Sequence, residues 1–249
     1  PPVLNKGKAK PIRKVDPKKL KGAKRSGLAT KLSPQLATLV EVIPDEGEWI
    51  SEIKFDGYRM VARLENGKVQ LFSRNGLPWT AKLPEIAKAL GRLPAKQAWL
   101  DGEVVAVEPE GRSSFSLLKQ ALSEKRTSGL VYYLFDILHL DGSDLAACRQ
   151  DDRKRVLHGL LGPSPPSRLL YSDHVEGITD QIREQACSMR LEGIICKDTA
   201  APYRQTRTKA WLKLKCVQRE EFIILGFTDP EGSRIGFGAE RAIASTGMA

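Results

Sequence analysis

The chain has 249 residues, of which 41% are hydrophobic, enough for one large folded domain or for one domain with attached pieces. Lys and Arg number 40 against 30 Asp and Glu, so the net charge is +10 and a polyanion such as nucleic acid is the favoured partner. No apolar run approaches the ~20 residues that cross a bilayer. We therefore expect a cytoplasmic protein without a membrane partner.

The cysteines give no sign of a metal site or of a disulfide framework. Cys148, Cys187, Cys196 and Cys216 are scattered without C-x-x-C spacing, and the three histidines are not grouped with them. This pattern favours a reducing compartment.

The first part of the chain is basic. Residues 1–27 are rich in Lys, Pro and Gly with almost nothing to bury, which predicts a basic flexible linker, either a solvated tether or a non-specific contact to nucleic acid. Strand-like segments follow at 49–53, 58–64 and 69–72. Asn66-Gly67 separates the last two and predicts a hairpin.

Helix and strand patterns alternate over the rest of the chain. Apolar residues recur at helical spacing in four segments, and β-prone runs lie between them; the helical segments are 83–90, 115–122, 151–160 and 178–189, and the strands are 99–107, 130–138, 193–197 and 211–215. A new apolar run at 222–227, followed by the turn-rich stretch 229–233, predicts a second domain. The stretch from 217 to 249 is short for the ~5 strands of even a small barrel.

Lys54 stands in the chemically most informative segment, Ser51-Glu52-Ile53-Lys54-Phe55-Asp56-Gly57-Tyr58-Arg59. A lone lysine at the end of a strand is usually a surface residue. An amine shielded from bulk water beside a second cation, here Arg59, can instead lose its proton and attack a phosphorus atom. The Asp56-Gly57 turn would fold the chain back and bring that arginine close.

The segment from Lys54 to Arg59 resembles the K-x-D-G-x-R nucleophile motif of the covalent nucleotidyltransferases, which include ATP-dependent DNA ligases, RNA ligases and mRNA capping enzymes. Further segments match the order of this family's motifs: Ser73-Arg74-Asn75-Gly76, Leu100-Asp101-Gly102-Glu103, 133–138, Glu192-Gly193-Ile194-Ile195-Cys196-Lys197 and Trp211-Leu212-Lys213-Leu214-Lys215. Each segment alone has an ordinary explanation, namely a turn, a core strand or a solvated edge strand. Their order favours the family. The resemblance spans 28 to about 238 and is closest to the ligase module of bacterial multidomain ligases of non-homologous end joining.

The resemblance implies a role for each site residue. Lys54 would be the nucleophile that takes up AMP. Glu52 and the Ile53 backbone would read the adenine edge, Phe135 would stack on the base, Arg74 and Glu103 would contact the ribose, and Arg59, Lys213 and Lys215 would bind phosphate. Glu192 would hold Mg²⁺ or Mn²⁺, Lys197 would face the phosphate, and Arg74 and Arg207 would contact DNA. Thr206 precedes Arg207 where the family usually has glycine.

The implied fold is α+β. An adenylation domain over 28–216, built of antiparallel sheets flanked by helices, would be followed by the start of a truncated OB-fold barrel over 217–249. The barrel normally carries a basic motif that orients pyrophosphate, so we expect weak self-adenylation and weak sealing of pre-adenylated nicks.

The implied function is ATP-dependent sealing of nicked or broken double-stranded DNA in repair. End-joining proteins or fused end-processing domains would be further partners, and the setting would be bacterial and nucleoid-associated. Two alternatives remain. One is an RNA ligase or capping-type guanylyltransferase, and the other is a catalytically inert fragment that binds nucleic acid.

Overall fold

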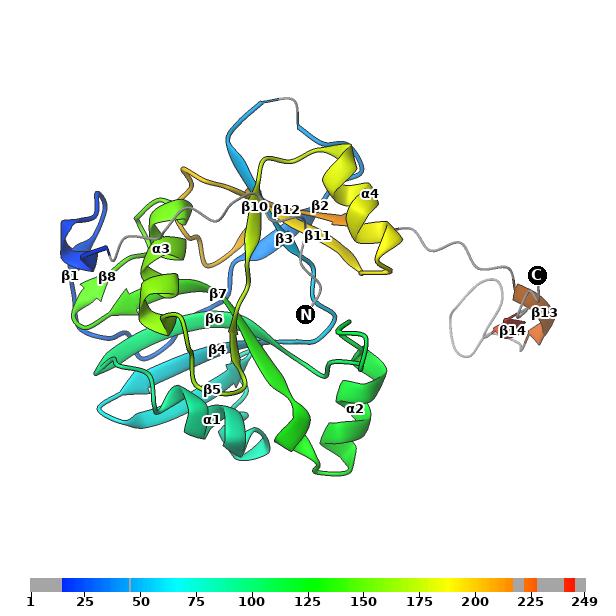
Figure 1. Ribbon diagram of the computed structural model, residues 1–249, viewed down its shortest axis with the longest axis horizontal. Helices are drawn as coiled ribbons and strands as arrows, with labels where there is room; N and C mark the ends of the chain where they lie inside the picture. Colours follow the sequence, from blue (N-terminus) through cyan, green and yellow to red (C-terminus); the bar gives the residue numbers. More distant parts are fainter. Residues whose placement is uncertain (1–14, 45, 217–221, 228–239, 245–249) are drawn as a thin grey trace, which may run out of the picture. The chain divides into compact units, whose positions relative to one another are not determined.

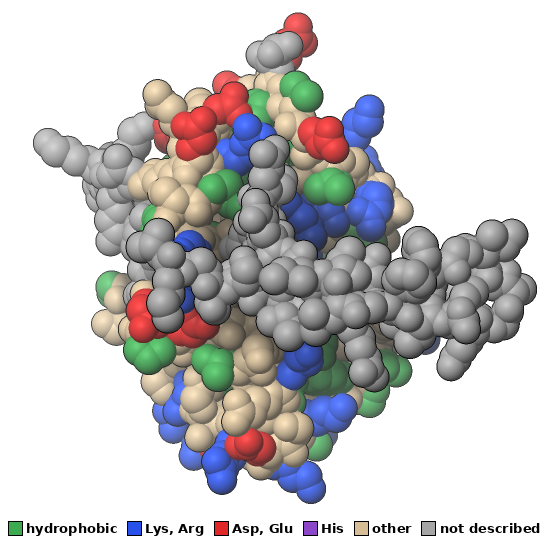
Figure 2. Space-filling view, turned by 90° about the vertical axis from the view of Figure 1, so that its right-hand side faces the viewer, with side chains coloured by type: hydrophobic (Ala, Val, Ile, Leu, Met, Phe, Trp, Pro, Cys, Tyr) green, Lys and Arg blue, Asp and Glu red, His purple; other side chains and the backbone are tan. Residues whose placement is uncertain are grey.

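The computed structural model describes residues 15–44, 46–216, 222–227 and 240–244. The chain divides into two units, one ending at Cys216 and the other beginning at Val217. The first unit contains two β-sheets with α-helices around them (Figure 1). On the face seen in Figure 2, Lys and Arg side chains lie at several places, with groups of Asp and Glu between them. None of the helices in the described ranges combines the length and the apolar character of a transmembrane span.

The larger sheet has seven strands in the order β1-β8-β7-β6-β4-β5, with β9 paired in parallel to β7. Its strands are β1 (Lys24–Arg25), β4 (Tyr58–Glu65), β5 (Lys68–Ser73), β6 (Gln97–Val105), β7 (Val131–Leu140), β8 (Ser143–Asp144) and β9 (Leu169–Tyr171). The predicted hairpin is confirmed as β4 and β5. Asn66 and Gly67 have φ angles of 48° and 81°, which a two-residue turn of this kind requires.

The smaller sheet has five strands in the order β10-β3-β11-β12-β2. They are β2 (Leu36–Leu39), β3 (Trp49–Ile53), β10 (His174–Glu176), β11 (Gly193–Asp198) and β12 (Arg207–Lys215). Both sheets are mainly antiparallel, as expected. Each also contains one parallel pair, β7 with β9 and β12 with β2, which strand periodicity alone does not reveal.

Helices cover the outer face of each sheet (Figure 1). The structure contains α1 (Pro84–Leu90), α2 (Phe115–Ser123), α3 (Gln150–Leu161) and α4 (Asp180–Ser188), with short 3-10 turns η1 (Pro17–Lys19), η2 (Thr80–Lys82) and η3 (Thr127–Gly129). Ile86, Leu118 and Leu157 from the first three helices join a core with the large sheet. Ala186 of α4 packs with Ile53 and other residues of the small sheet. The four predicted apolar stripes are therefore confirmed as helices.

A third apolar cluster joins the two sheets. Val61, Trp99 and Phe135 of the large sheet pack with Trp211 of the small sheet and with Tyr203. This contact holds the inner faces of the sheets together beside the pocket that contains the candidate site.

Part of the predicted linker is folded. Val15, Leu20 and Ala23 pack against the core of the large sheet, and Lys24 and Arg25 pair with β8. The expectation of a flexible linker is therefore wrong for residues 15–27, because a few small apolar residues and one strand pairing suffice to attach this basic segment. Residues 1–14 lie outside the described ranges.

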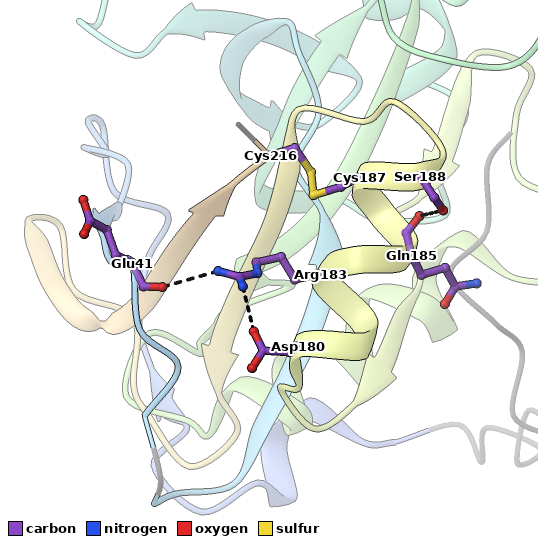
Figure 3. Close-up of a disulfide and its surroundings, with 7 residues drawn as sticks. All are labelled: Glu41, Asp180, Arg183, Gln185, Cys187, Ser188 and Cys216. Carbon is purple, nitrogen blue, oxygen red and sulfur yellow. Dashed lines mark hydrogen bonds and ion pairs between the residues drawn. A yellow bond between two sulfur atoms is a disulfide. The ribbon is translucent and has the colours of Figure 1, made fainter. Parts of the chain in front are cut away.

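A disulfide joins Cys187 in the last turn of α4 to Cys216 directly after β12 (Figure 3). Their Cα atoms lie 5.3 Å apart although the residues are 29 positions apart in sequence. The cysteine spacing predicted that the chain has no disulfide framework. This prediction is wrong for Cys187 and Cys216, because the packing of α4 on the sheet brings the two residues together. In the same region, Arg183 donates to the backbone oxygen of Glu41.

In the second unit the structure describes an antiparallel pair, β13 (Phe222–Phe227) and β14 (Glu240–Ala244). The apolar run at 222–227 is a strand of this second unit. The predicted turn at 229–233 lies outside the described residues, and an incomplete OB-fold stays a prediction.

Candidate active site

Lys54 follows β3 directly and lies on the wall of a pocket of about 190 Å³. Its backbone N–H donates to the Gly193 oxygen at 2.9 Å, which fixes the base of the side chain against β11. Its amine forms an ion pair with Glu192, and 19% of the lysine side chain is exposed. The candidate nucleophile is thus held in place and partly shielded from water.

Two motif glycines allow neighbouring strands to approach closely. A Cβ atom on Gly57 would lie 2.3 Å from the Val104 oxygen, and one on Gly193 would lie 2.1 Å from the Leu214 oxygen. Gly193 also has a φ of 146°, in the region that favours glycine. These positions exclude other residues, which explains why glycine follows the carboxylate in both motifs.

Arg59 on β4 is fixed by a buried carboxylate. Its Nε and Nη2 donate to the two oxygens of Asp101 at 2.6 and 2.7 Å, and Tyr203 Oη donates to the same carboxylate at 2.6 Å. Burial alone would lower the pKa of Arg59, but the ion pair with Asp101 raises it above its ordinary value. Nη1 takes part in none of these bonds, and Arg59 lines the pocket.

Glu103 follows Asp101-Gly102 on β6 and lines the pocket. Burial raises the pKa of its carboxyl to about 7. The positive charges of Arg59 and Lys54 oppose this rise, and the negative charges of Asp101 and Glu192 add to it. The group therefore changes charge near neutral pH in the free protein. A ligand that donates hydrogen bonds to it would favour the ionised form.

Phe135 of β7 and Trp211 of β12 meet edge to face at the pocket, with ring centroids 6.0 Å apart. The Lys197 amine lies 4.4 Å from the centroid of Phe135 and 4.3 Å from that of Trp211. The guanidinium carbon of Arg59 lies 4.5 Å from the Phe135 centroid. Two cations thus already contact the ring on which a base was expected to stack.

Lys197 is a buried lysine that lines the pocket. It is 1% exposed, and its amine lies 2.8 Å from Glu52 Oε1. Burial lowers the pKa of Lys197 to about 8, although the Glu52 carboxylate opposes this. In this structure buried Glu52 is the counter-ion of Lys197, which also lines the pocket, and a contact of this lysine with phosphate stays a prediction.

Cations gather on one side of the pocket. Lys213 lines it together with Arg207, from the start of β12, and Arg74, from the turn after β5. Burial lowers the pKa of Lys213, and Arg207, Lys215, Lys54 and Arg74 lower it further. So much positive charge fits an anionic ligand that carries phosphate groups.

The pocket collects most of the residues that the sequence indicated. Its lining includes Glu52, Ile53, Lys54, Arg59, Arg74, Glu103, Phe135, Arg207 and Lys213. Glu192 and Lys215 lie outside this lining but next to it. Glu192 pairs with Lys54, and the Lys215 amine lies 3.7 Å from Glu192.

Other lining residues had no assigned role in the sequence. Leu36 and Ala37 come from β2, which pairs with β12 and carries no motif. Trp211 also lines the pocket. Asp101 could have been found, since it belongs to the Asp-Gly-Glu motif, but an Asp-Gly pair by itself indicates only a turn.

The acidic residues do not form a complete metal site. No group of three or more His, Cys, Asp or Glu side chains that could hold a metal occurs among the described residues. Glu192 contributes one carboxylate beside Lys54. This fits Mg²⁺, which usually binds one or two carboxylates together with substrate phosphates and water.

Comparisons with known proteins agree with these features. Residues 28–215 match the family described as ATP dependent DNA ligase domain. The chain is 41% identical over 208 residues to the multifunctional non-homologous end joining protein LigD of Pseudomonas aeruginosa, which covers 84% of this chain and 25% of that protein. It is 28% identical over 217 residues to the SPbeta prophage-derived DNA ligase-like protein LigB of Bacillus subtilis, which covers 83% of this chain and 78% of that protein.

Solved structures show the same fold. The ligase domain of LigD from Mycobacterium tuberculosis is 31% identical with a TM-score of 0.65, over 78% of this chain and 63% of that one. A mycobacterial DNA ligase D complexed with ATP is 28% identical with a TM-score of 0.65, over 85% of this chain and 67% of that one. The chain spans about a quarter of the length of the LigD relatives that it matches.

Proposed function

Because the chain belongs to the ATP-dependent DNA ligase family, we propose that it takes AMP from ATP onto Lys54 and passes it to the 5′-phosphate at a break in DNA, which is then sealed. The observation that carries this proposal is the position of the Lys54 amine on the wall of a pocket that Arg59, Arg74 and Lys213 also line. A nucleophile surrounded by fixed cations suits attack on a phosphate ester.

Three displacements at phosphorus follow. The unprotonated Lys54 amine attacks the α-phosphorus of ATP, the bond to pyrophosphate breaks, and the amine releases a proton. A 5′-phosphate oxygen of the DNA then attacks the same phosphorus, and the P–N bond to lysine breaks. Finally the 3′-hydroxyl attacks the 5′-phosphate and AMP leaves. Arg59 and Lys213 offset the negative charge that gathers at the phosphorus.

The contacts of the pocket support a division of roles for ATP. The ionised carboxylate of Glu52 and the backbone of Ile53 would face the base, and Phe135 would lie against it. Glu103 and Arg74 would contact the ribose, Arg59, Lys213 and Lys215 would contact the phosphates, and Arg74 and Arg207 would contact DNA. The raised pKa of Glu103 supports its role, because hydroxyl donors would stabilise its ionised form.

Glu192 would hold Mg²⁺ or Mn²⁺ together with the phosphates of the nucleotide. The ion, when bound, would neutralise phosphate charge. In this structure Glu192 is the counter-ion of Lys54. Any change that draws Glu192 away from the lysine would free the amine for contact with a phosphate.

The proposed reaction serves the repair of nicked or broken double-stranded DNA. The LigD relatives are named for non-homologous end joining, which supports end-joining proteins or fused end-processing domains as partners. The net charge of +10 supports a DNA substrate. Residues 217–249, which follow the adenylation domain in the sequence, would then belong to an OB-fold.

Labelling of the protein tests the proposal. The chain is incubated with α-labelled ATP or GTP and Mg²⁺ or Mn²⁺, and an acid-stable adduct is measured. ATP should label the protein weakly, Lys54→Ala should abolish the label, and Lys88→Ala, at an exposed position on α1, should retain it. A pre-adenylated nicked duplex isolates the last step.

Each other result has a distinct meaning. Labelling by GTP alone would favour a capping-type enzyme. Salt-sensitive DNA binding without any adduct, unchanged in Lys54→Ala, would indicate an inert binding fragment. A label that persists in Lys54→Ala would refute Lys54 as the nucleophile.

A further inference from the structure

Glu52 is a buried carboxylate with a nearly complete set of donors. Its side chain lines the pocket although the residue is only 1% exposed. Oε1 accepts from Lys154 at 3.0 Å and lies 2.8 Å from the amine of Lys197, and Oε2 accepts from Ser172 Oγ at 2.7 Å. A carboxylate offers about four lone-pair sites, so about one remains for a ligand.

Two of these donors lie outside the pocket lining. Lys154 projects from α3, is 1% exposed, and also donates to the Ser172 backbone oxygen at 2.5 Å. Its amine lies 4.4 Å from the ring centroid of Tyr171. Ser172, also 1% exposed, lies in the turn between β9 and β10. Lys154 thus reaches Glu52 from α3, and Ser172 reaches it from the connection between β9 and β10.

We propose that Lys154 and Ser172 are positioning residues that keep Glu52 an acceptor-only reader of the nucleotide base, so that the site selects a purine with an amino group at position 6 over one with a carbonyl there. The inference rests on the proposed function in one respect, namely that the base lies against Glu52. It assigns the choice of base to residues that do not touch the nucleotide.

The chemistry of the two purines supports this selection. The 6-amino group of adenine donates hydrogen bonds, whereas the 6-carbonyl of guanine only accepts them. An ionised carboxylate repels the carbonyl and leaves it without a donor. A protonated carboxyl could donate to this carbonyl, and a carboxylate that is free to turn away would no longer repel it, so either would tolerate guanine.

The charge of Glu52 depends on these neighbours. Burial would raise the pKa of Glu52, but Lys154 and Lys197, with the hydrogen bond from Ser172, lower it to about 2. Without Lys154, only one buried cation, Lys197, would oppose the effect of burial on the pKa of Glu52. The carboxyl should therefore begin to protonate at a higher pH.

Other titratable groups near Glu52 keep their charge between about pH 5.5 and pH 7. His174 pairs with Glu52 across β10 and β3, and burial lowers its pKa to about 4. Burial raises the pKa of Tyr171 to about 12 and that of Cys196 to about 11. Lys197 stays protonated, since its pKa is about 8. Glu103 changes charge at the upper end of this window, but it would contact the ribose, which ATP and GTP share. A pH effect on the preference between the two bases therefore reports on Glu52.

Equilibrium binding of ATP and of GTP by calorimetry tests the inference, using the full chain at about pH 5.5 and about pH 7. The wild-type protein should prefer ATP equally at both values. Lys154→Met should reduce this preference about tenfold, and more at the lower pH, because a protonated carboxyl can donate to guanine. Lys154→Arg should restore it. Ser172→Ala should reduce the preference about threefold.

Arg155→Met is the matched control, because Arg155 lies on the same helix with its side chain 51% exposed and should leave the preference unchanged. Should Lys154→Met fail to fold, as judged by circular dichroism, Lys154→Arg and Ser172→Ala carry the test.

Two outcomes would overturn the inference. One is a preference for ATP over GTP that stays unchanged in both Lys154→Met and Ser172→Ala. If Lys154→Met does not fold, an unchanged preference in Ser172→Ala alone has the same meaning. The other is a loss in Lys154→Met of the same size at both pH values, which would mean that Lys154 only supports packing. Failure of the proposed function would look different: the wild-type protein would bind ATP without forming a Lys54 adduct.

Discussion

Replacing Glu103 with glutamine should stabilise the free protein at alkaline pH while weakening nucleotide binding. Burial raises the pKa of Glu103 from 4.5 to about 7. Because the pKa is higher in the folded than in the unfolded protein, the folded state holds this proton more tightly. The wild-type protein therefore loses stability from this group as pH rises from 4.5 through about 7.

The size of the effect follows from that difference in pKa. Each tenfold change in a protonation equilibrium is worth about 1.4 kcal/mol. The rise from 4.5 to about 7 thus corresponds to roughly 3 kcal/mol in the free energy of unfolding. Glutamine is similar in shape and never charged. The Glu103→Gln variant should therefore match the wild type near pH 4.5 and exceed it by roughly 3 kcal/mol at pH 8.

Urea unfolding followed by circular dichroism measures this difference between about pH 5 and pH 8, without nucleotide or metal. Glu85→Gln, at an exposed position on α1, is the control and should show no pH-dependent gain. Calorimetry should show weaker ATP binding by Glu103→Gln. A variant that is less stable than the wild type at pH 8, or a difference that does not grow with pH, would refute the reasoning.

Three further changes test other parts of the structure. Reduction of the Cys187–Cys216 disulfide should lower the free energy of unfolding by about 3–4 kcal/mol, because the bond closes a loop of 29 positions. A Cys187→Ser, Cys216→Ser double variant should have the same low stability as the reduced protein, and reductant should not change it. An effect of reductant on that double variant would contradict this prediction. Asp101→Asn should weaken ATP binding about tenfold in calorimetry, because a neutral amide holds Arg59 less firmly; unchanged binding would show that Arg59 does not depend on this pair. Arg207→Ala should reduce the slope of log affinity for DNA against log salt by about 1 in fluorescence anisotropy, and an unchanged slope would remove Arg207 from the DNA contact.

Local patterns in the chain predicted the hairpin, the helices and most of the pocket. Asn66-Gly67 predicts a turn because a two-residue hairpin loop needs left-handed backbone. The glycine after Glu192 is required because a side chain there would overlap β12. These features depend on a few neighbouring residues, so the sequence states them directly. The order of the motifs then indicated which charged side chains would share a site.

Contacts between distant segments came only with the folded structure. Lys197 pairs with Glu52, and Cys187 forms a disulfide with Cys216. The basic segment at 15–27 attaches to the large sheet through a few apolar side chains. The spacing of residues along the chain does not predict such pairs. A buried charged side chain pairs with the counter-ion that packing places beside it, and a cysteine forms a disulfide with the cysteine that the fold brings within bonding distance. The candidate nucleophile was therefore evident from the sequence, whereas the partners that hold its pocket in shape were not.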